Sequence, residues 1–167
     1  MGKTRYLQNQ IVRPSVLPCI IVDTLDEYED YAIEGKITDD INFDMFKIRF
    51  RPMSDLEFDI VCRCVCEQRF RPGVNFIVEE TDQFVGEHRI PWNFLRLVYE
   101  SRHYNINVYL CVHSPVDMNA KIRNICKQFL VFNLTEHNYL QYFGKIDPAL
   151  PAKIRHLKEG QYITIDL

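Results

Sequence analysis

Short runs of apolar residues recur along this chain and predict buried strands. Four of them are nearly continuous, at residues 19–22 (CIIV), 74–78 (VNFIV), 106–112 (INVYLCV) and 129–132 (FLVF). Runs of this length without polar alternation are typical of parallel strands that are buried on both faces of a sheet. Residues 162–167 alternate instead, as a final edge strand does.

Apolar residues at helical spacing fill the segments between these runs. Ser54 and Glu57 form a capping-box signature, and the helix that they begin is expected to end before Pro72-Gly73. Pro91 suits the first turn of another helix. Its apolar stripe is expected to consist of Trp92, Leu95, Val98 and Tyr99. Further helices are predicted over residues 5–12, 118–127 and 135–143.

This alternation of strands and helices predicts an α/β fold, with a mostly parallel sheet flanked by helices on both faces. The 167 residues suit one domain, and they contain no linker, repeat or low-complexity tract. A composition of 47% hydrophobic and 26% charged residues is that of a soluble globular protein.

The net charge and the hydropathy of the chain exclude some locations and some kinds of partner. The formal net charge of −3 excludes the broad basic surface of a nucleic-acid coat protein, so any contact with DNA must be local. No apolar run approaches the length of a membrane span. The start of the chain lacks the apolar middle of a signal peptide. We therefore expect a cytoplasmic location.

The six cysteines lie mostly inside apolar segments. They are Cys19, Cys62, Cys64, Cys66, Cys111 and Cys126. This placement fits core thiols in a reducing compartment better than a disulfide scaffold. The closely spaced trio in the middle of the chain invites a zinc interpretation, but no second Cys or His pair follows at zinc-finger spacing, and buried thiols are favoured.

Polar residues that follow strands are the first candidates for chemistry, because ligands of parallel sheets collect beyond the carboxyl ends of the strands. Four predicted strands end in such residues. They are Asp23 after the first run, Glu79 and Glu80 after the second, His113 after the third and Asn133 after the fourth.

Gly2-Lys3-Thr4 matches the second half of a phosphate-binding loop of the form G-x-x-x-x-G-K-[ST]. Such a site needs a lysine on the phosphates, a hydroxyl and a carboxylate around Mg²⁺, and a second carboxylate to orient water. Lys3, Thr4, Glu79 and Glu80 supply this set, which points to ATP. The first glycine of the loop and the strand that feeds it would lie ahead of Gly2. We therefore expect residues 1–167 to form one ATPase-like domain that lacks its first strand.

Five segments in order resemble the HerA/FtsK superfamily of P-loop ATPases. They are GKT, IIVDTLDEY, FIVEE, SRHYNINVYLCVHSP and IRNICKQFLVFNLTE. Within the superfamily, the chain is most similar to viral genome-packaging ATPases and to zonula occludens toxin-type phage assembly proteins. The resemblance implies a P-loop NTPase fold of the additional-strand, catalytic-glutamate type. It also implies a motor subunit that hydrolyses ATP at the interfaces of a homo-oligomeric ring and moves DNA, in the host cytoplasm or with the virion.

The resemblance assigns roles to the candidate residues. Gly2, Lys3 and Thr4 would bind the phosphates, with Thr4 and Glu79 also holding Mg²⁺. Glu80 would be the general base. The family usually has aspartate where this chain has Glu79, and the longer side chain would reposition the carboxylate.

Two further positions are assigned in the same way. His113 stands where the family's sensor glutamine usually lies, although a histidine could equally cap the turn into Ser114-Pro115. Arg102 matches an arginine linked to subunit contacts. It follows a helix that returns to the opposite edge of the sheet, so it could reach only a neighbouring subunit's nucleotide, and a simple helix-end cation is the alternative. Arg89 and Arg96 are reserve candidates, Arg96 also being placed to pair with Glu100.

The residues Asp23, Glu27 and Tyr28 look like the family's D-x-x-x-E-Y strand end. Neighbouring acids favour a solvated loop for all but Asp23. Contacts to the DNA backbone are expected from a few cations of each subunit, for example in a ring of six. The candidates are Arg63, Arg69, Arg71, Lys121, Arg123 and Lys127.

Two other classes of protein stay open. One is a degenerate ATPase-fold module that binds a partner in an assembly or DNA-processing complex without hydrolysis, as the incomplete loop and Glu79 would suit. The other is an unrelated α/β protein such as a flavodoxin-like signalling domain, in which Asp23 would be the key acid.

Overall fold

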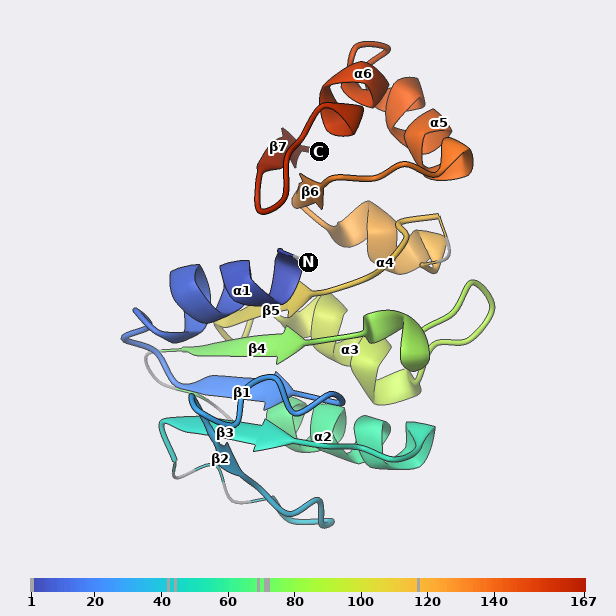
Figure 1. The fold of residues 1–167 in the computed structure, drawn as a ribbon. Helices are drawn as coiled ribbons and strands as arrows, with labels where there is room; N and C mark the ends of the chain where they lie inside the picture. The colour runs from blue at the N-terminus through green and yellow to red at the C-terminus, as the bar shows by residue number, and fades with distance from the viewer. Residues whose placement is uncertain (1, 42, 44, 69, 71–72, 117) are drawn as a thin grey trace.

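A parallel sheet forms the centre of the computed structural model, which describes residues 2–41, 43, 45–68, 70, 73–116 and 118–167. Five strands follow one another in the order β2-β3-β1-β4-β5 (Figure 1). They are β1 (Cys19–Val22), β2 (Ile33–Glu34), β3 (Lys47–Phe50), β4 (Val74–Val78) and β5 (Ile106–Leu110). The predicted strands at 19–22 and 74–78 are confirmed, and the third predicted strand ends two residues early.

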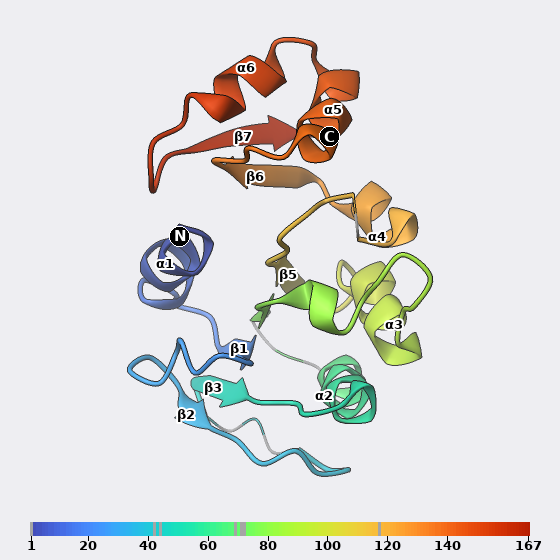
Figure 2. The same ribbon diagram turned by 45° about the vertical axis from the view of Figure 1, so that its right-hand side comes forward.

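Helices cover both faces of this sheet (Figure 2). They are α1 (Lys3–Tyr6) with its π-helical continuation η1 (Leu7–Val12), α2 (Asp55–Glu67) and α3 (Trp92–Glu100). Alternate residues of β1 serve the two layers, because successive side chains of a strand point to opposite faces. Ile20 and Val22 join the core of α2 and α3, whereas Ile21 packs under the α1–η1 segment. The predicted α/β fold is thus confirmed.

The chain beyond β5 forms a second, smaller sheet. β6 (Gln128–Phe132) and β7 (Tyr162–Asp166) pair with each other in antiparallel register. The helices of this part are α4 (Ala120–Ile125), α5 (His137–Ile146) and α6 (Leu150–Arg155). The prediction that residues 129–132 join the parallel sheet is therefore wrong, and β7 is not an edge of it. A groove lined by residues of both β5 and β6 separates the two sheets.

Two helices agree with the sequence pattern to different degrees. The Ser54 hydroxyl accepts the Glu57 N–H at 3.2 Å, so the predicted cap of α2 is confirmed; the helix ends at Glu67, and Pro72 lies outside the described residues. The predicted stripe of α3 is wrong at both ends, because Trp92 and Tyr99 are 72% and 54% exposed. The buried face of α3 carries Phe94, Leu97 and Val98 instead.

Packing against α2 determines which face of α3 is buried. Phe94 meets Phe58 of α2 with ring centroids 5.3 Å apart, and such aromatic contact fixes which face of a helix is buried. None of the described helices has both the length and the apolar character needed to cross a membrane.

Candidate functional site

Glu79 follows β4 at the carboxyl edge of the sheet and is almost fully buried, with 1% of its surface exposed. Its carboxylate Oε1 accepts a hydrogen bond from the Tyr28 hydroxyl at 2.5 Å. Burial raises the pKa of Glu79, and the Tyr28 and Cys111 contacts oppose that rise. The same burial, next to the charge of Glu79, raises the pKa of the Tyr28 phenol and of the Cys111 thiol. Both of these partners are therefore neutral hydrogen-bond donors at neutral pH.

The turn after β1 is held by Asp23, which is fully buried. Its two carboxylate oxygens accept the backbone N–H groups of Glu27 and Tyr28, each at 2.9 Å, and Arg49 lies 3.3 Å away. The expectation of a solvated loop is wrong for Tyr28, which has no exposed surface because its ring packs under the α1–η1 segment. Asp23 is bonded on both oxygens, so it is not the available acid that a flavodoxin-like signalling domain needs.

Lys3 and Thr4 begin α1 beside these acids. The Lys3 ammonium donates to the carbonyl of Val112 at 2.9 Å, just before His113. The Thr4 hydroxyl donates to the Glu27 carboxylate at 3.0 Å. A Cβ at Gly2 would come within 2.8 Å of the Phe132 ring of β6, so glycine allows a close approach here.

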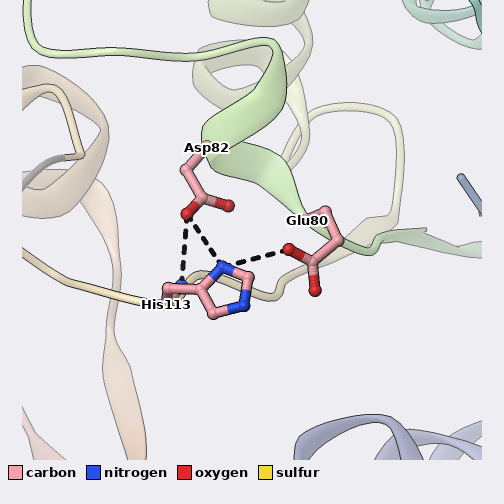
Figure 3. A group of neighbouring side chains, drawn as sticks. All are labelled: Glu80, Asp82 and His113. Atoms are coloured by element: carbon pink, nitrogen blue, oxygen red, sulfur yellow. Dashed lines mark hydrogen bonds and ion pairs between the residues drawn. The ribbon is translucent and has the colours of Figure 1, made fainter. Parts of the chain in front are cut away.

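Glu80, Asp82 and His113 form a second cluster at the same edge (Figure 3). The His113 Nδ1 lies 3.0 Å from the Glu80 carboxylate and 3.1 Å from that of Asp82. Glu80 has left-handed backbone dihedrals with φ at 48°, which turns it away from Glu79 into the short helix η2 (Thr81–Gln83). Donor atoms of the three residues lie within 4.8 Å of one another and could hold a metal ion.

The donors around Glu79 suit Mg²⁺ in type. A hydroxyl on Thr4 and carboxylates on Glu27 and Glu79 are the hard oxygen ligands that Mg²⁺ prefers. Lys3 and Glu27 are close enough to Glu79 to shift its pKa in opposite directions, Lys3 lowering it and Glu27 raising it. The structure therefore brings together the predicted residues Lys3, Thr4 and Glu79, and it adds Glu27.

The candidate arginines differ in position, and Arg89 donates to the Gln83 carbonyl of η2 at this edge. Arg102 is exposed and precedes β5, at the amino end of the strand, whereas Lys3 bonds to Val112 beyond its carboxyl end. Arg96 pairs with Glu100 at 3.0 Å, which confirms the predicted i, i+4 pair. Arg89 contacts Asp55 at 3.1 Å.

The predicted DNA-binding cations differ in availability. Arg123 donates to three backbone carbonyls and lies 5.0 Å from the ring centroid of Tyr142, so it holds the structure together. Arg63 pairs with Asp39. Lys121 and Lys127 are exposed. Two further candidates, Arg69 and Arg71, lie outside the described residues.

The cysteines are free thiols, and all but the half-buried Cys126 are buried. Burial raises the pKa of Cys66 to about 11 and that of Cys62 well above its usual value. Within the described part of the chain, the group with metal-ligand geometry is the Glu80 cluster, and none of these thiols belongs to it.

A groove of about 860 Å³ runs along β5, between the parallel sheet, the α1–η1 segment and β6. Lys3 lines one end of it and Arg102 the other. The Cys111 N–H and C=O both bond toward β4, at Val78 and Thr81. Because backbone groups alternate in direction along a strand, those of Val108 and Leu110 point into the groove.

Sequence reasoning missed several partners in the site. Asp82 follows the strand end by four residues, so the same strand-end rule applied over a wider window finds it. The contacts of Tyr28 with Glu79 and of Arg49 with Asp23 join residues far apart in the chain, and no local pattern signals them. Asn133, which follows the fourth predicted strand, is exposed, and its side-chain amide donates to the carbonyl of Leu157.

Comparison of the whole fold with solved structures gives strong matches. The genome packaging NTPase B204 from Sulfolobus turreted icosahedral virus 2, in complex with AMP, matches with a TM-score of 0.81 at 16% identity, over 98% of this chain and 87% of that one. Its complex with ATP-gammaS gives 0.82 at 15% identity, over 99% and 86%. B204, the DNA-packaging ATPase from Sulfolobus turreted icosahedral virus, gives 0.80 at 14% identity, over 98% and 86%.

Comparisons of sequence add no relatives. No protein-family profile matches the chain, and no curated protein matches it. At these low identities, the structural likeness establishes the fold. The chain has the fold of viral genome-packaging ATPases, and the resemblance predicted from its sequence motifs is confirmed at that level.

Proposed function

We propose that this chain is the ATPase subunit of a genome-packaging motor. The observation that carries the proposal is that Lys3 and Thr4 reach the carboxyl edge of the sheet, where Lys3 is close enough to Glu79 to lower its pKa and Thr4 bonds to Glu27. Solved structures with this fold are complexes with AMP, ATP-gammaS and AMPPCP. Gly2, Lys3 and Thr4 bind the phosphates of ATP. Thr4 and Glu79 hold Mg²⁺, which when bound neutralises charge on the phosphates.

The two acids after β4 have different tasks. Glu79 is buried and bonded to Tyr28, so its carboxylate is fixed in place, whereas Glu80 is half-buried and open to a water molecule. Glu80 is the general base that accepts a proton from the attacking water, and His113 orients its carboxylate from 3.0 Å. Arg102 lies before β5, at the end of the strand opposite Lys3, so it cannot reach the nucleotide of its own subunit. It stabilises negative charge on the nucleotide of the neighbouring subunit in a ring.

We also propose that the groove beside β5 receives a strand that leads into Gly2. The backbone groups of Val108 and Leu110 point into it, and Lys3 lies at its end, so such a strand would join the two sheets and complete the phosphate loop. Amide hydrogen exchange tests this directly. The two amides are expected to exchange fast in residues 1–167 alone and to be protected when the strand is present; equal exchange in both would contradict the insertion.

DNA contacts in the proposed ring are made by exposed lysines. Lys121 and Lys127 remain available on the described surface, since Arg123 is committed to backbone carbonyls. A few such cations from each subunit suffice to follow a phosphate backbone. Base sequence is not expected to matter.

ATP hydrolysis with and without double-stranded DNA tests the function. We expect Glu80→Gln to lower the hydrolysis rate by about 100-fold or more, as loss of a general base does, while nucleotide binding persists. Glu159→Gln, at an exposed acid of the turn before β7, is the matched control. Equal rates for wild type and Glu80→Gln would overturn the assignment.

The second candidate is a module that binds nucleotide or a partner without hydrolysis. The burial of Glu79 under Tyr28 favours it, because a sealed carboxylate resembles a structural acid more than a metal ligand. Nucleotide binding without turnover, with DNA present, would support this module over the motor.

A further inference from the structure

The turn that follows β1 contacts two residues of the proposed nucleotide site at once. Glu27 accepts the hydroxyl proton of Thr4 at 3.0 Å, and the next residue, Tyr28, donates its own hydroxyl to Glu79 at 2.5 Å. One short segment therefore touches both of the residues assigned to Mg²⁺, although these lie at opposite ends of the chain's first eighty residues.

This turn is a rigid support. Asp23 accepts the backbone N–H groups of both contacting residues at 2.9 Å, which fixes their positions relative to the end of β1. Arg49 binds Asp23 and also lies 2.6 Å from Asp26, whose backbone has a left-handed φ of 57°. The Tyr28 ring is fully buried against the core under α1.

We propose that Glu27 and Tyr28 are positioning residues of the magnesium site, Glu27 for the Thr4 hydroxyl and Tyr28 for the Glu79 carboxylate. The inference rests on the proposed function, because it needs Thr4 and Glu79 to face Mg²⁺. Both residues belong to the segment IIVDTLDEY, whose pattern by itself assigns neither of them a role toward Mg²⁺.

The chemistry of the two contacts supports complementary tasks. A hydroxyl has one proton and two lone pairs, so a Thr4 proton that is committed to Glu27 leaves the lone pairs free for a cation. Tyr28 donates to Oε1 of Glu79, and the Cys111 thiol also bonds to this carboxylate, so the group is held in one orientation. Such outer contacts orient the groups that bind a metal, and their loss typically weakens metal affinity by about 10- to 100-fold.

The test is titration of a fluorescent ATP analogue against the folded chain, in excess Mg²⁺ and in EDTA. Mg²⁺ should raise the affinity of wild type for the ATP analogue, and we expect this increase to be about 10-fold or more smaller in Tyr28→Phe and in Glu27→Ala. The affinity in EDTA should be unchanged. Glu27→Gln keeps a carbonyl acceptor and should retain most of the gain. Tyr31→Phe, in the same core layer, is the control.

The outcomes separate this inference from the proposed function. If wild type gains affinity from Mg²⁺ and both variants keep the gain, the positioning roles are wrong and the nucleotide site stands. If wild type binds no nucleotide, the proposed function fails, and titration with Mn²⁺ alone then decides. Weaker Mn²⁺ binding in Glu27→Ala and Tyr28→Phe would still support the positioning, and equal binding would overturn it. Glu27 is exposed, so its variants stay folded and informative even if Tyr28→Phe does not.

Discussion

Glu79 and Glu80 are adjacent in the chain but lie in opposite environments. Glu79 has 1% of its surface exposed and is enclosed by Tyr28 and Cys111, under α1. Glu80 turns outward through a left-handed residue and meets the mostly exposed His113. The difference teaches how one strand end can supply two carboxylates for two tasks. Burial fixes a group and disfavours its charge, whereas a position nearer the surface leaves a group accessible to water.

Mutations around Glu79 should therefore change stability as well as activity, whereas mutations around Glu80 should change activity with little effect on stability. Buried groups that are bonded to one another carry folding energy, because each loses water and must be compensated. Partly exposed groups at a strand end contribute little to the free energy of folding. The predictions below contrast the two regions, beginning with the largest effect.

Tyr28→Ala should give the largest loss of stability. It leaves a cavity under α1 and an unpaired buried carboxylate on Glu79, and truncation of a buried aromatic ring costs about 3–5 kcal/mol. Chemical denaturation measures this. Tyr28→Phe retains the ring and should lose much less. A loss below about 1 kcal/mol for the alanine variant would show that Tyr28 is not packed as described.

Glu79→Gln should stabilise the protein at neutral pH. The pKa of Glu79 is higher in the folded protein than in the unfolded chain, so its ionised form lowers the free energy of unfolding when the pH is above the folded pKa. This loss of stability disappears as the pH falls to the ordinary pKa of a glutamate. An amide avoids this cost. We expect a gain of about 1 kcal/mol near pH 7, or roughly 2–4 °C in Tm for a chain of this size, and little gain near pH 4.

The paired measurement is thermal unfolding of wild type and Glu79→Gln at both pH values. A gain that is the same at pH 4 and pH 7 would come from something other than ionisation. A loss at neutral pH would mean that the Tyr28 bond to the charged carboxylate outweighs its burial.

Glu80→Gln and His113→Ala should leave stability within about 0.5 kcal/mol of wild type, because both side chains reach solvent. The same Glu-to-Gln change thus differs in its effect on stability at neighbouring positions: stability rises at Glu79 and stays nearly unchanged at Glu80, while hydrolysis is expected to fall at both. Denaturation midpoints with matched slopes give the comparison. A destabilisation above about 1 kcal/mol for Glu80→Gln would erase the distinction between the two regions.

The sequence pattern predicts the parts of the fold that carry apolar runs. β1 and β4 are found because every residue in them is buried. β3 is missed because it contains Lys47 and Arg49, and Arg49 is buried in ion pairs with Asp23, Asp26 and Glu34. β2 consists of two exposed residues, Ile33 and Glu34, which are too few to form an apolar run.

The candidate site follows the same division. The rule that ligands gather at strand ends locates Glu79, Glu80 and His113, since chain order and parallel pairing are enough to bring them to one edge. The solvated interpretation of Tyr28 fails because its burial depends on α1, which joins from the start of the chain. Local acidity predicts the exposure of Glu27 correctly but gives no hint of its bond to Thr4.

The most direct test of the account is binding of a fluorescent ATP analogue with Mg²⁺ to wild type and to Lys3→Ala, with Lys153→Ala on the exposed face of α6 as control. The account predicts saturable binding by wild type and by the control, and a loss of about 100-fold or more in Lys3→Ala, since the lysine contacts the phosphates. Equal binding by all three proteins, or binding by none, would contradict a nucleotide site at Lys3.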